Sequence, residues 1–119
     1  MKNTNEMACA ALRFLNLITA IRTLPTIPSL DPLEERVLMA LAQNWATGIA
    51  VTVMMILSTF NDASPSTVHR RLKSLKQKGL ITMREDENDN RTKYVEPTDL
   101  TNNYFNEIGK CMAAAAKAL

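Results

Sequence analysis

The residues between Ser64 and Arg84 have the types that bind a polyanion. This segment contains no aspartate or glutamate and six basic residues: Arg70, Arg71, Lys73, Lys76, Lys78 and Arg84. The whole chain of 119 residues carries a net charge of only +2, so the remainder of the chain is acidic overall. Positive charge concentrated on one element is typical of proteins that bind nucleic acid.

The same segment is predicted to form a helix with well-defined ends. Pro65 fits the first helical position and pushes Ser64 toward the extended conformation of an N-cap. At the other end Gly79 suits the left-handed position after a helix, and Leu80 can then fold back onto Leu75. We therefore expect a basic helix at about Pro65–Lys78.

At 100° per residue this helix has an apolar side and a polar side. The apolar stripe is Val68, Leu72 and Leu75. The opposite side carries Ser66, Thr67, Arg70, Lys73, Ser74 and Gln77. Short hydroxyl side chains let a helix approach the DNA major groove closely, and an arginine can bind a guanine edge through two hydrogen bonds. The pattern therefore predicts a DNA recognition helix, with Ser64 included at its start.

Other basic side chains of this helix lie toward its flanks. Arg71, Lys76 and Lys78 are placed to meet phosphates there, and His69 is placed to contact phosphate or solvent. The alternative for the whole helix is a solvated surface element whose charges serve solubility.

Helices are also predicted on the N-terminal side of this segment. Apolar residues recur at three- and four-residue steps over residues 7–21, in a helix that stops before Pro25. Asp31-Pro32-Leu33-Glu34 provides an N-cap, a first-turn proline and a capping-box carboxylate for a second helix that ends at Gly48. Residues 49–51 can form a short strand. Thr52 then caps a third helix, which is apolar nearly all round and therefore expected to be buried.

A β-hairpin is predicted after the basic helix. Residues 80–84 and 92–96 alternate apolar and polar side chains, with a polar run between them. The third helix, the turn at 61–63 and the basic helix have the order of a helix-turn-helix, so this hairpin would be a wing. Its tip is acidic and would repel phosphate, which leaves three basic residues as candidate DNA contacts: Arg84, Arg91 and Lys93. Asp89 can hold Arg91 in place through an ion pair. A solvated turn without DNA contact is the alternative.

Both ends of the chain carry more apolar surface than a compact winged core would cover. Thr98 or Thr101 caps a last helix whose end, residues 113–116, is alanine-rich and allows close helix approach. We predict a dimer interface, although the two terminal helices could instead pack on each other within one chain. The predicted domains are 1–30 (N-terminal dimerisation helix and Pro-containing linker), 31–97 (winged-helix DNA-binding domain) and 98–119 (C-terminal dimerisation helix).

Several classes of function are excluded by the composition. The chain has no apolar run long enough to span a membrane and no secretory signal, which predicts a cytoplasmic protein. Cys9 and Cys111 have no partner at ligand spacing, so we expect reduced thiols and no metal, with a redox switch as the alternative. There is no carboxylate pair, Cys–His constellation or glycine-rich phosphate loop, which predicts a protein that is not an enzyme and needs no cofactor.

Over about residues 31–112 the chain resembles the MarR-type winged helix-turn-helix transcriptional regulators. The resemblance rests on Ser66-Thr67-Val68, Arg70-Arg71-Leu72, Leu75, Gly79-Leu80-Ile81 and Asp89-Asn90-Arg91. It implies a symmetric dimer with interlocking terminal helices and one recognition helix per subunit in the major groove of a pseudo-palindrome, usually repressing transcription. It also implies that Ser66, Thr67 and Arg70 read bases, that Arg71 and Lys73 hold phosphates, and that Arg91 is the wing arginine. The chain departs from the family in its more acidic wing and its shorter length.

The sequence therefore predicts a mainly α protein with a small β-hairpin wing. Its expected function is sequence-specific binding of double-stranded DNA as a dimeric transcriptional regulator. Two alternatives keep the winged helix: an accessory factor for replication or partition, and a protein-interaction module. Selection of a short inverted repeat from random duplexes would distinguish a sequence-specific regulator from a protein-interaction module.

Overall fold

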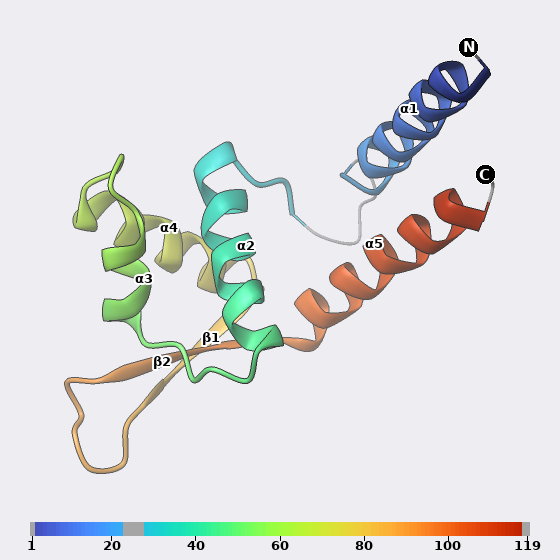
Figure 1. Ribbon diagram of the computed structural model, residues 1–119. Coiled ribbons are helices and arrows are strands. Elements are labelled where there is room, and N and C mark those ends of the chain that lie inside the picture. Colours follow the sequence, from blue (N-terminus) through green and yellow to red (C-terminus); the bar gives the residue numbers. More distant parts are fainter. Residues whose placement is uncertain (1, 23–27, 118–119) are drawn as a thin grey trace. The chain divides into compact units, whose positions relative to one another are not determined.

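The computed structural model describes residues 2–22 and 28–117, which form five helices and two strands (Figure 1). In chain order these are α1 (Lys2–Arg22), α2 (Pro32–Ala46), α3 (Val53–Thr59), α4 (Pro65–Gln77), β1 (Ile81–Glu85), β2 (Lys93–Pro97) and α5 (Asp99–Lys117). The predicted mainly helical fold with a two-stranded antiparallel hairpin is confirmed. Within the predicted Pro-containing linker, residues 23–27 lie outside the described residues.

The chain divides into two compact units. One unit spans residues 30–101 and contains α2, α3, α4, the hairpin and the first residues of α5. The other unit combines α1 with α5 from Asn102 onward. All the candidate DNA contacts belong to the first unit, so they can be described within one framework.

The core of the 30–101 unit is built around α4. Val68, Leu72 and Leu75 are fully buried, which confirms the predicted apolar stripe. Helices α2 and α3 and strand β1 all pack against α4. These elements, β2 and the joining segments supply the other buried apolar side chains: Val37, Leu38, Leu41, Val51, Ile56, Leu80, Ile81 and Val95. Apolar packing therefore holds one side of the basic helix and leaves another side facing outward.

Side-chain caps define where the helices of this unit begin. The Glu34 N–H donates to Asp31 Oδ1 at 2.7 Å, and the Asp31 N–H donates to Glu34 Oε1 at 2.9 Å, which is the predicted capping box. Thr52 and Ser64 each accept a hydrogen bond from the N–H three residues further on, at 3.2 Å. The predicted starts of α2, α3 and α4 are therefore confirmed.

Thr98, one of the two candidate caps, begins α5. Its Oγ1 accepts a hydrogen bond from the Thr101 N–H at 3.4 Å and donates one to the Gly79 carbonyl at 2.7 Å. Thr101 is fully buried, and its hydroxyl donates to the Leu80 carbonyl. The first turn of α5 is thus bonded to the segment that ends α4.

The prediction of a strand at residues 49–51 is wrong. Residues 49–51 are not part of a strand; the Val95 N–H donates to the Val51 carbonyl at 2.8 Å, and the next residue, Thr52, forms an isolated bridge with Tyr94. Helix α3 begins at Val53, so the capping geometry of Thr52 takes over before a strand can extend.

The prediction that α3 is buried is also wrong. Only Ile56 of this helix is fully buried, while the Met54 side chain is 72% exposed and Met55 is 39% exposed. The helix has seven residues and packs against α4, α2 and β2, so one side of it meets neighbours and the other meets solvent. Helix α3 is therefore apolar nearly all round but buried on one side only.

The hairpin protrudes from this unit beyond the helices (Figure 1). Its strands pair in antiparallel register, with Ile81 opposite Pro97 and Glu85 opposite Lys93. At its base the indole Nε1 of Trp45 donates a hydrogen bond to the Val95 carbonyl at 3.0 Å. Because Trp45 is the chain's one tryptophan, its fluorescence reports on the junction between α2 and the wing.

Helix α4 ends in a Schellman motif, as predicted. The Gly79 N–H donates to the Lys76 carbonyl and the Leu80 N–H donates to the Leu75 carbonyl, both at 3.0 Å. Gly79 has a φ of +80°, a conformation that residues with a Cβ rarely adopt. This glycine therefore ends the helix and directs the chain into β1.

Gly79→Ala is expected to destabilise the protein by about 1–2 kcal/mol, because left-handed backbone is unfavourable for alanine. A Cβ at this position meets no atom within 4 Å, so the effect comes from the backbone and not from a clash. Gly109→Ala in α5 is the matched control: its Cβ also meets nothing, and alanine favours a helix by up to about 1 kcal/mol. Urea unfolding, monitored by circular dichroism, measures the stability of both variants. Equal changes in the free energy of unfolding would contradict the left-handed cap at Gly79.

The second unit carries exposed apolar side chains on its helices. On α1, Met7, Leu12 and Leu15 are 56–67% exposed, and on α5 Met112 is 49% exposed. Cys9 is exposed and Cys111 is half-buried, and neither forms a disulfide. None of the described helices combines the length and apolar character needed to cross a membrane.

Candidate nucleic-acid interface

Three hydroxyl side chains gather at the start of α4. The Ser64 Oγ lies 3.2 Å from the Ser66 Oγ and 2.8 Å from the Thr67 Oγ1. Ser64 and Ser66 are exposed and Thr67 is half-buried. The hydroxyls lie at the positive end of the helix dipole, where phosphate oxygens and groove acceptors bind favourably. These candidate residues thus form one small polar cluster.

The outward side of α4 is polar and mostly basic. Arg70, Lys73, Lys76 and Gln77 are all exposed. Among the described residues, no carboxylate pairs with Arg70, Lys73 or Lys76, although ion pairs form elsewhere on this helix. The positive potential of this side is therefore available to an anionic partner.

A second ridge of α4 faces the start of α2. Lys78 Nζ lies 2.8 Å from both carboxylate oxygens of Glu34, and the Ser74 hydroxyl donates to Glu34 Oε2 at 2.7 Å. Arg71 Nε lies 2.9 Å from Asp31 Oδ2, in an ion pair without hydrogen-bond alignment. The placement of Ser74 on the outward side is therefore wrong, and Arg71 and Lys78 meet carboxylates where phosphates were expected. Positions 71, 74 and 78 share one helix ridge, and α2 covers it.

The carboxylate at the centre of this ridge is shielded from solvent. Glu34 is 3% exposed. Burial by itself raises its pKa, but hydrogen bonds from the Asp31 N–H, Lys78 and Ser74, together with the Lys78 charge, hold the pKa of Glu34 below its ordinary value. Glu34 is therefore an anion in the folded protein at neutral pH.

Arg36 ties the turn before α4 to α2. Its Nη1 and Nη2 donate to the two oxygens of Asp62 at 2.9 and 3.1 Å, and its guanidinium lies 5.2 Å from the centroid of the Phe60 ring. These hydrogen bonds and the arginine charge lower the pKa of Asp62. The pair is exposed and its energy is small, but its two-point geometry defines where the turn lies.

The acidic tip of the wing uses two of its carboxylates to shape the loop. Asp86 Oδ2 accepts from the N–H groups of Asn88 and Asp89 at 3.0 Å, and Asp86 Oδ1 accepts from the Tyr94 hydroxyl at 3.1 Å. Asp89 Oδ1 accepts from the Arg91 N–H at 3.1 Å and from its Nε at 3.2 Å, which lowers the pKa of Asp89. The predicted pairing of Asp89 with Arg91 is confirmed.

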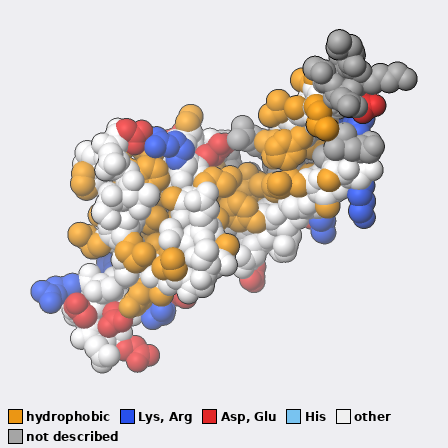
Figure 2. Space-filling view, in the orientation of Figure 1, with side chains coloured by type: hydrophobic (Ala, Val, Ile, Leu, Met, Phe, Trp, Pro, Cys, Tyr) orange, Lys and Arg blue, Asp and Glu red, His pale blue; other side chains and the backbone are white. Residues whose placement is uncertain are grey.

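The remaining charges of the tip stand in solvent. The Arg91 side chain is 88% exposed, and Glu85 and Glu87 are exposed as well. Figure 2 shows basic and acidic side chains side by side at this end of the molecule. Asp89 therefore orients an arginine at the wing tip while leaving most of it accessible.

Arg84, a third candidate wing contact, is held within the hairpin. Its Nε donates to Glu96 Oε1 at 3.0 Å, and its guanidinium lies 4.8 Å from the centroid of the Tyr94 ring. Lys93 lies opposite Glu85 in the register, but within the described part of the chain it forms no ion pair. Arg91 and Lys93 are thus the wing cations with exposed side chains that are not held within the hairpin.

The free energy of unfolding is expected to decrease as the pH is lowered through the acid range, because three carboxyl groups have lowered pKa values: Glu34, Asp62 and Asp89. A group whose pKa is lower in the folded state stabilises that state fully above its unfolded pKa and progressively less as pH falls through the folded pKa. The midpoint of urea unfolding should therefore be constant above about pH 5 and decline below it. The decline should be shallower in Glu34→Gln, and an unchanged slope would contradict the assigned shift of Glu34.

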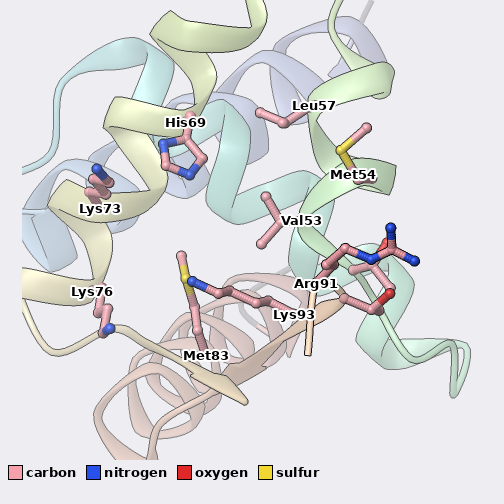
Figure 3. A pocket seen from close by; sticks show the side chains of 11 residues that line it. Val53, Met54, Leu57, His69, Lys73, Lys76, Met83, Arg91 and Lys93 are labelled. Carbon is pink, nitrogen blue, oxygen red and sulfur yellow. The ribbon is translucent and has the colours of Figure 1, made fainter. Parts of the chain in front are cut away.

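A cleft of about 520 Å³ lies between α3, α4 and the hairpin (Figure 3). Helix α4 contributes His69, Lys73 and Lys76, and the wing contributes Arg91 and Lys93. The basic side chains of two separate elements thus line the same concave surface. Of the predicted contacts, His69, Lys73, Arg91 and Lys93 are brought together here, while the hydroxyl cluster lies one turn earlier on α4.

The opposite wall of the cleft is apolar, and the sequence did not reveal it. Val53, Met54 and Leu57 of α3 form this wall and face His69 across the cleft (Figure 3). The apolar composition of α3 predicts a core helix, whereas one side of this helix is exposed. The signal that could have found it is the length of the helix, since seven residues between a cap and a turn can bury only one side.

Comparison with protein-family models and with curated proteins finds no match. Solved structures do match the fold, at low sequence identity. YusO from Bacillus subtilis is 20% identical, with a TM-score of 0.60 over 98% of this chain and 74% of the other. A MarR-like transcriptional regulator from Thermotoga maritima is 20% identical, with a TM-score of 0.63 over 98% of this chain and 77% of the other. The DNA-bound structure of reduced AbfR is 17% identical, with a TM-score of 0.57 over 95% of this chain and 75% of the other.

This chain has the MarR-type winged-helix fold. In this MarR-type fold α3 and α4 are the helix-turn-helix, and β1 and β2 are the wing. The recognition-helix position of this fold and its wing therefore border one cleft in this chain. The described residues contain no group of three His, Cys, Asp or Glu residues that could hold a metal ion.

Proposed function

We propose that this protein binds double-stranded DNA sequence-specifically, as a dimeric transcriptional regulator of the MarR type that acts as a repressor. The observation that supports the proposal is the division of charge on α4. Carboxylates at the start of α2 pair with Arg71 and Lys78, whereas Arg70 is exposed, and Lys73 and Lys76 line a cleft with the wing cations. A solvated helix would have no reason to separate its cations in this way.

Each part of the surface has a role in the proposal. Ser66, Thr67 and Arg70 read base edges from the major groove, because they lie on the first two turns of α4 and project outward. Lys73 and Lys76, with Arg91 and Lys93 of the wing, hold the phosphates that border the groove. His69 lies between these groups and can meet a phosphate as well.

A dimer is supported by the apolar surface of the terminal helices. Helix α1 exposes the apolar side chains of Met7, Leu12 and Leu15. Such exposure is unfavourable in water unless a partner covers these side chains. In the proposal a second copy covers these residues, with α5 contributing to the same interface. Two recognition helices related by a two-fold axis would then contact half-sites about one helical turn apart.

The test of this function is selection of DNA from a random duplex pool, followed by salt titration and sizing of the complex. We expect an inverted repeat bound by two subunits. Four phosphate-binding cations per subunit give a slope of about −7 for the logarithm of affinity against the logarithm of salt concentration. Binding without any site preference, or a flat salt response, would contradict the proposal.

A further inference from the structure

The buried carboxylate of Glu34 has no role in the surface described so far. Its two oxygens accept four hydrogen bonds: from the Asp31 N–H at 2.9 Å, from Ser74 Oγ at 2.7 Å, and from Lys78 Nζ at 2.8 Å to each oxygen. Four is about the number that a carboxylate can accept, so its bonding capacity is filled by protein groups. A buried charge so fully satisfied is stable in this arrangement and costly in any other.

The network joins one turn of α2 to two turns of α4. Glu34 reaches Ser74 and Lys78, and Asp31 reaches Arg71, so the contacts cover positions 71, 74 and 78. Asp31 and Glu34 are themselves locked together by the capping box. The contact therefore defines both the rotation of α4 about its axis and its position along that axis.

Apolar packing alone would not define the rotation of α4 about its axis or its position along that axis. The contact of α2 with the buried stripe of α4 is hydrophobic, and hydrophobic attraction has no direction. Hydrogen bonds to a buried carboxylate require particular distances and angles, and they weaken steeply when misaligned. A rotation of α4 that the apolar side chains could accommodate would break several of these bonds at once.

The rotation of α4 determines whether Arg70 can read a base. A helix with its side chains has a radius of about 6 Å, so a rotation of about 20° moves the tip of an outward side chain by about 2 Å. That displacement exceeds the tolerance of a paired hydrogen bond to a guanine edge. Contacts to phosphate by flexible lysines tolerate it better, because they depend on charge more than on alignment.

We propose that Glu34 is the positioning residue of the recognition helix, and that through Ser74 and Lys78 it sets the orientation in which Arg70 reads DNA. The proposal rests on the DNA-binding function proposed above. It also assigns Ser74 and Lys78 to the positioning of α4 and removes them from the set of DNA contacts. Glu34 thus contributes to sequence specificity without touching DNA.

The test compares Glu34→Gln with Glu107→Gln, which removes the same charge from an exposed glutamate that pairs with Lys110 of its own helix. Affinity is measured for the selected inverted repeat and for a scrambled duplex, at several salt concentrations. We expect Glu34→Gln to lower the ratio of specific to non-specific affinity about tenfold, as loss of one paired base contact would. Affinity for the scrambled duplex should stay about the same, because contacts to phosphate depend on charge more than on alignment. Glu107→Gln should leave the ratio unchanged.

Two further variants separate positioning from general destabilisation. Ser74→Ala removes one hydrogen bond while Lys78 still pairs with Glu34, so it should fold normally and lower the ratio by a smaller factor. Glu34→Gln combined with Lys78→Met also removes the buried cation that has lost its carboxylate partner, so stability should recover while the ratio stays low, because the directional hydrogen bonds are still absent. A ratio unchanged in both Glu34→Gln and Ser74→Ala would overturn the inference. Absence of site selection by the wild-type protein would instead overturn the proposed function itself.

Discussion

Arg70→Ala is expected to weaken binding to the selected DNA site by about 1–3 kcal/mol per half-site, or roughly 5- to 150-fold for each, and to relax the preference at one base pair in each half-site. Arg70 is exposed on the second turn of α4, on the side opposite the buried stripe. Its guanidinium can donate two parallel hydrogen bonds to a guanine, which alanine cannot replace. Repeating the selection with the variant shows which base position has lost its preference.

Two matched variants give this experiment its controls. Arg84→Ala also removes an arginine, but Arg84 is bonded to Glu96 and stacked on Tyr94, so base preference should be unchanged. Lys76→Ala should weaken binding to all sequences equally and reduce the salt slope, as expected for a phosphate contact. If Arg70→Ala behaved like Lys76→Ala, Arg70 would be a phosphate contact and the assignment of the base-reading side would have to change.

Leu72→Ala is expected to lower the free energy of unfolding by about 2–5 kcal/mol. Leu72 is fully buried at the centre of the α4 stripe, where α2, α3 and β1 pack against the helix. Truncation removes apolar contacts and leaves a cavity beneath the recognition helix. Urea unfolding followed by Trp45 fluorescence measures the loss.

Met54→Ala is the control for this change. Met54 is also a large apolar side chain, but it is 72% exposed on α3, and exposed substitutions usually change stability by less than about 0.5 kcal/mol. A loss of several kcal/mol in both variants would mean that α3 is buried in solution, as the sequence first suggested. A small loss in Leu72→Ala would contradict the central position of α4 in the core.

Several features were predictable because they depend on nearby residues. The start of α4 at Ser64 and Pro65 and its end at Gly79 follow from capping rules that act within about four residues. The hairpin follows from alternation over two short segments and a polar run between them. The loop contact between Asp89 and Arg91 joins residues two apart in the chain.

The errors concern burial and long-range pairing. Residues 49–51 have strand-forming types, but the cap of α3 follows at once, and residues 28–117 form no third strand. The apolar composition of α3 predicted burial, yet the helix is short and its neighbours cover only one side. Ser74 was placed with the outward residues, because a helical projection does not show which neighbour covers each ridge.

By itself the sequence determined that this protein contains a capped basic helix with an apolar stripe, followed by a hairpin, because caps and periodicity act over a few residues. Only the tertiary structure decided which basic side chains of that helix remain available. Glu34 and Lys78 are 44 residues apart in the chain, and their pairing depends on how α2 lies against α4. Hydrogen bonds to a buried charge are formed by the packed arrangement of helices, and no local pattern encodes them.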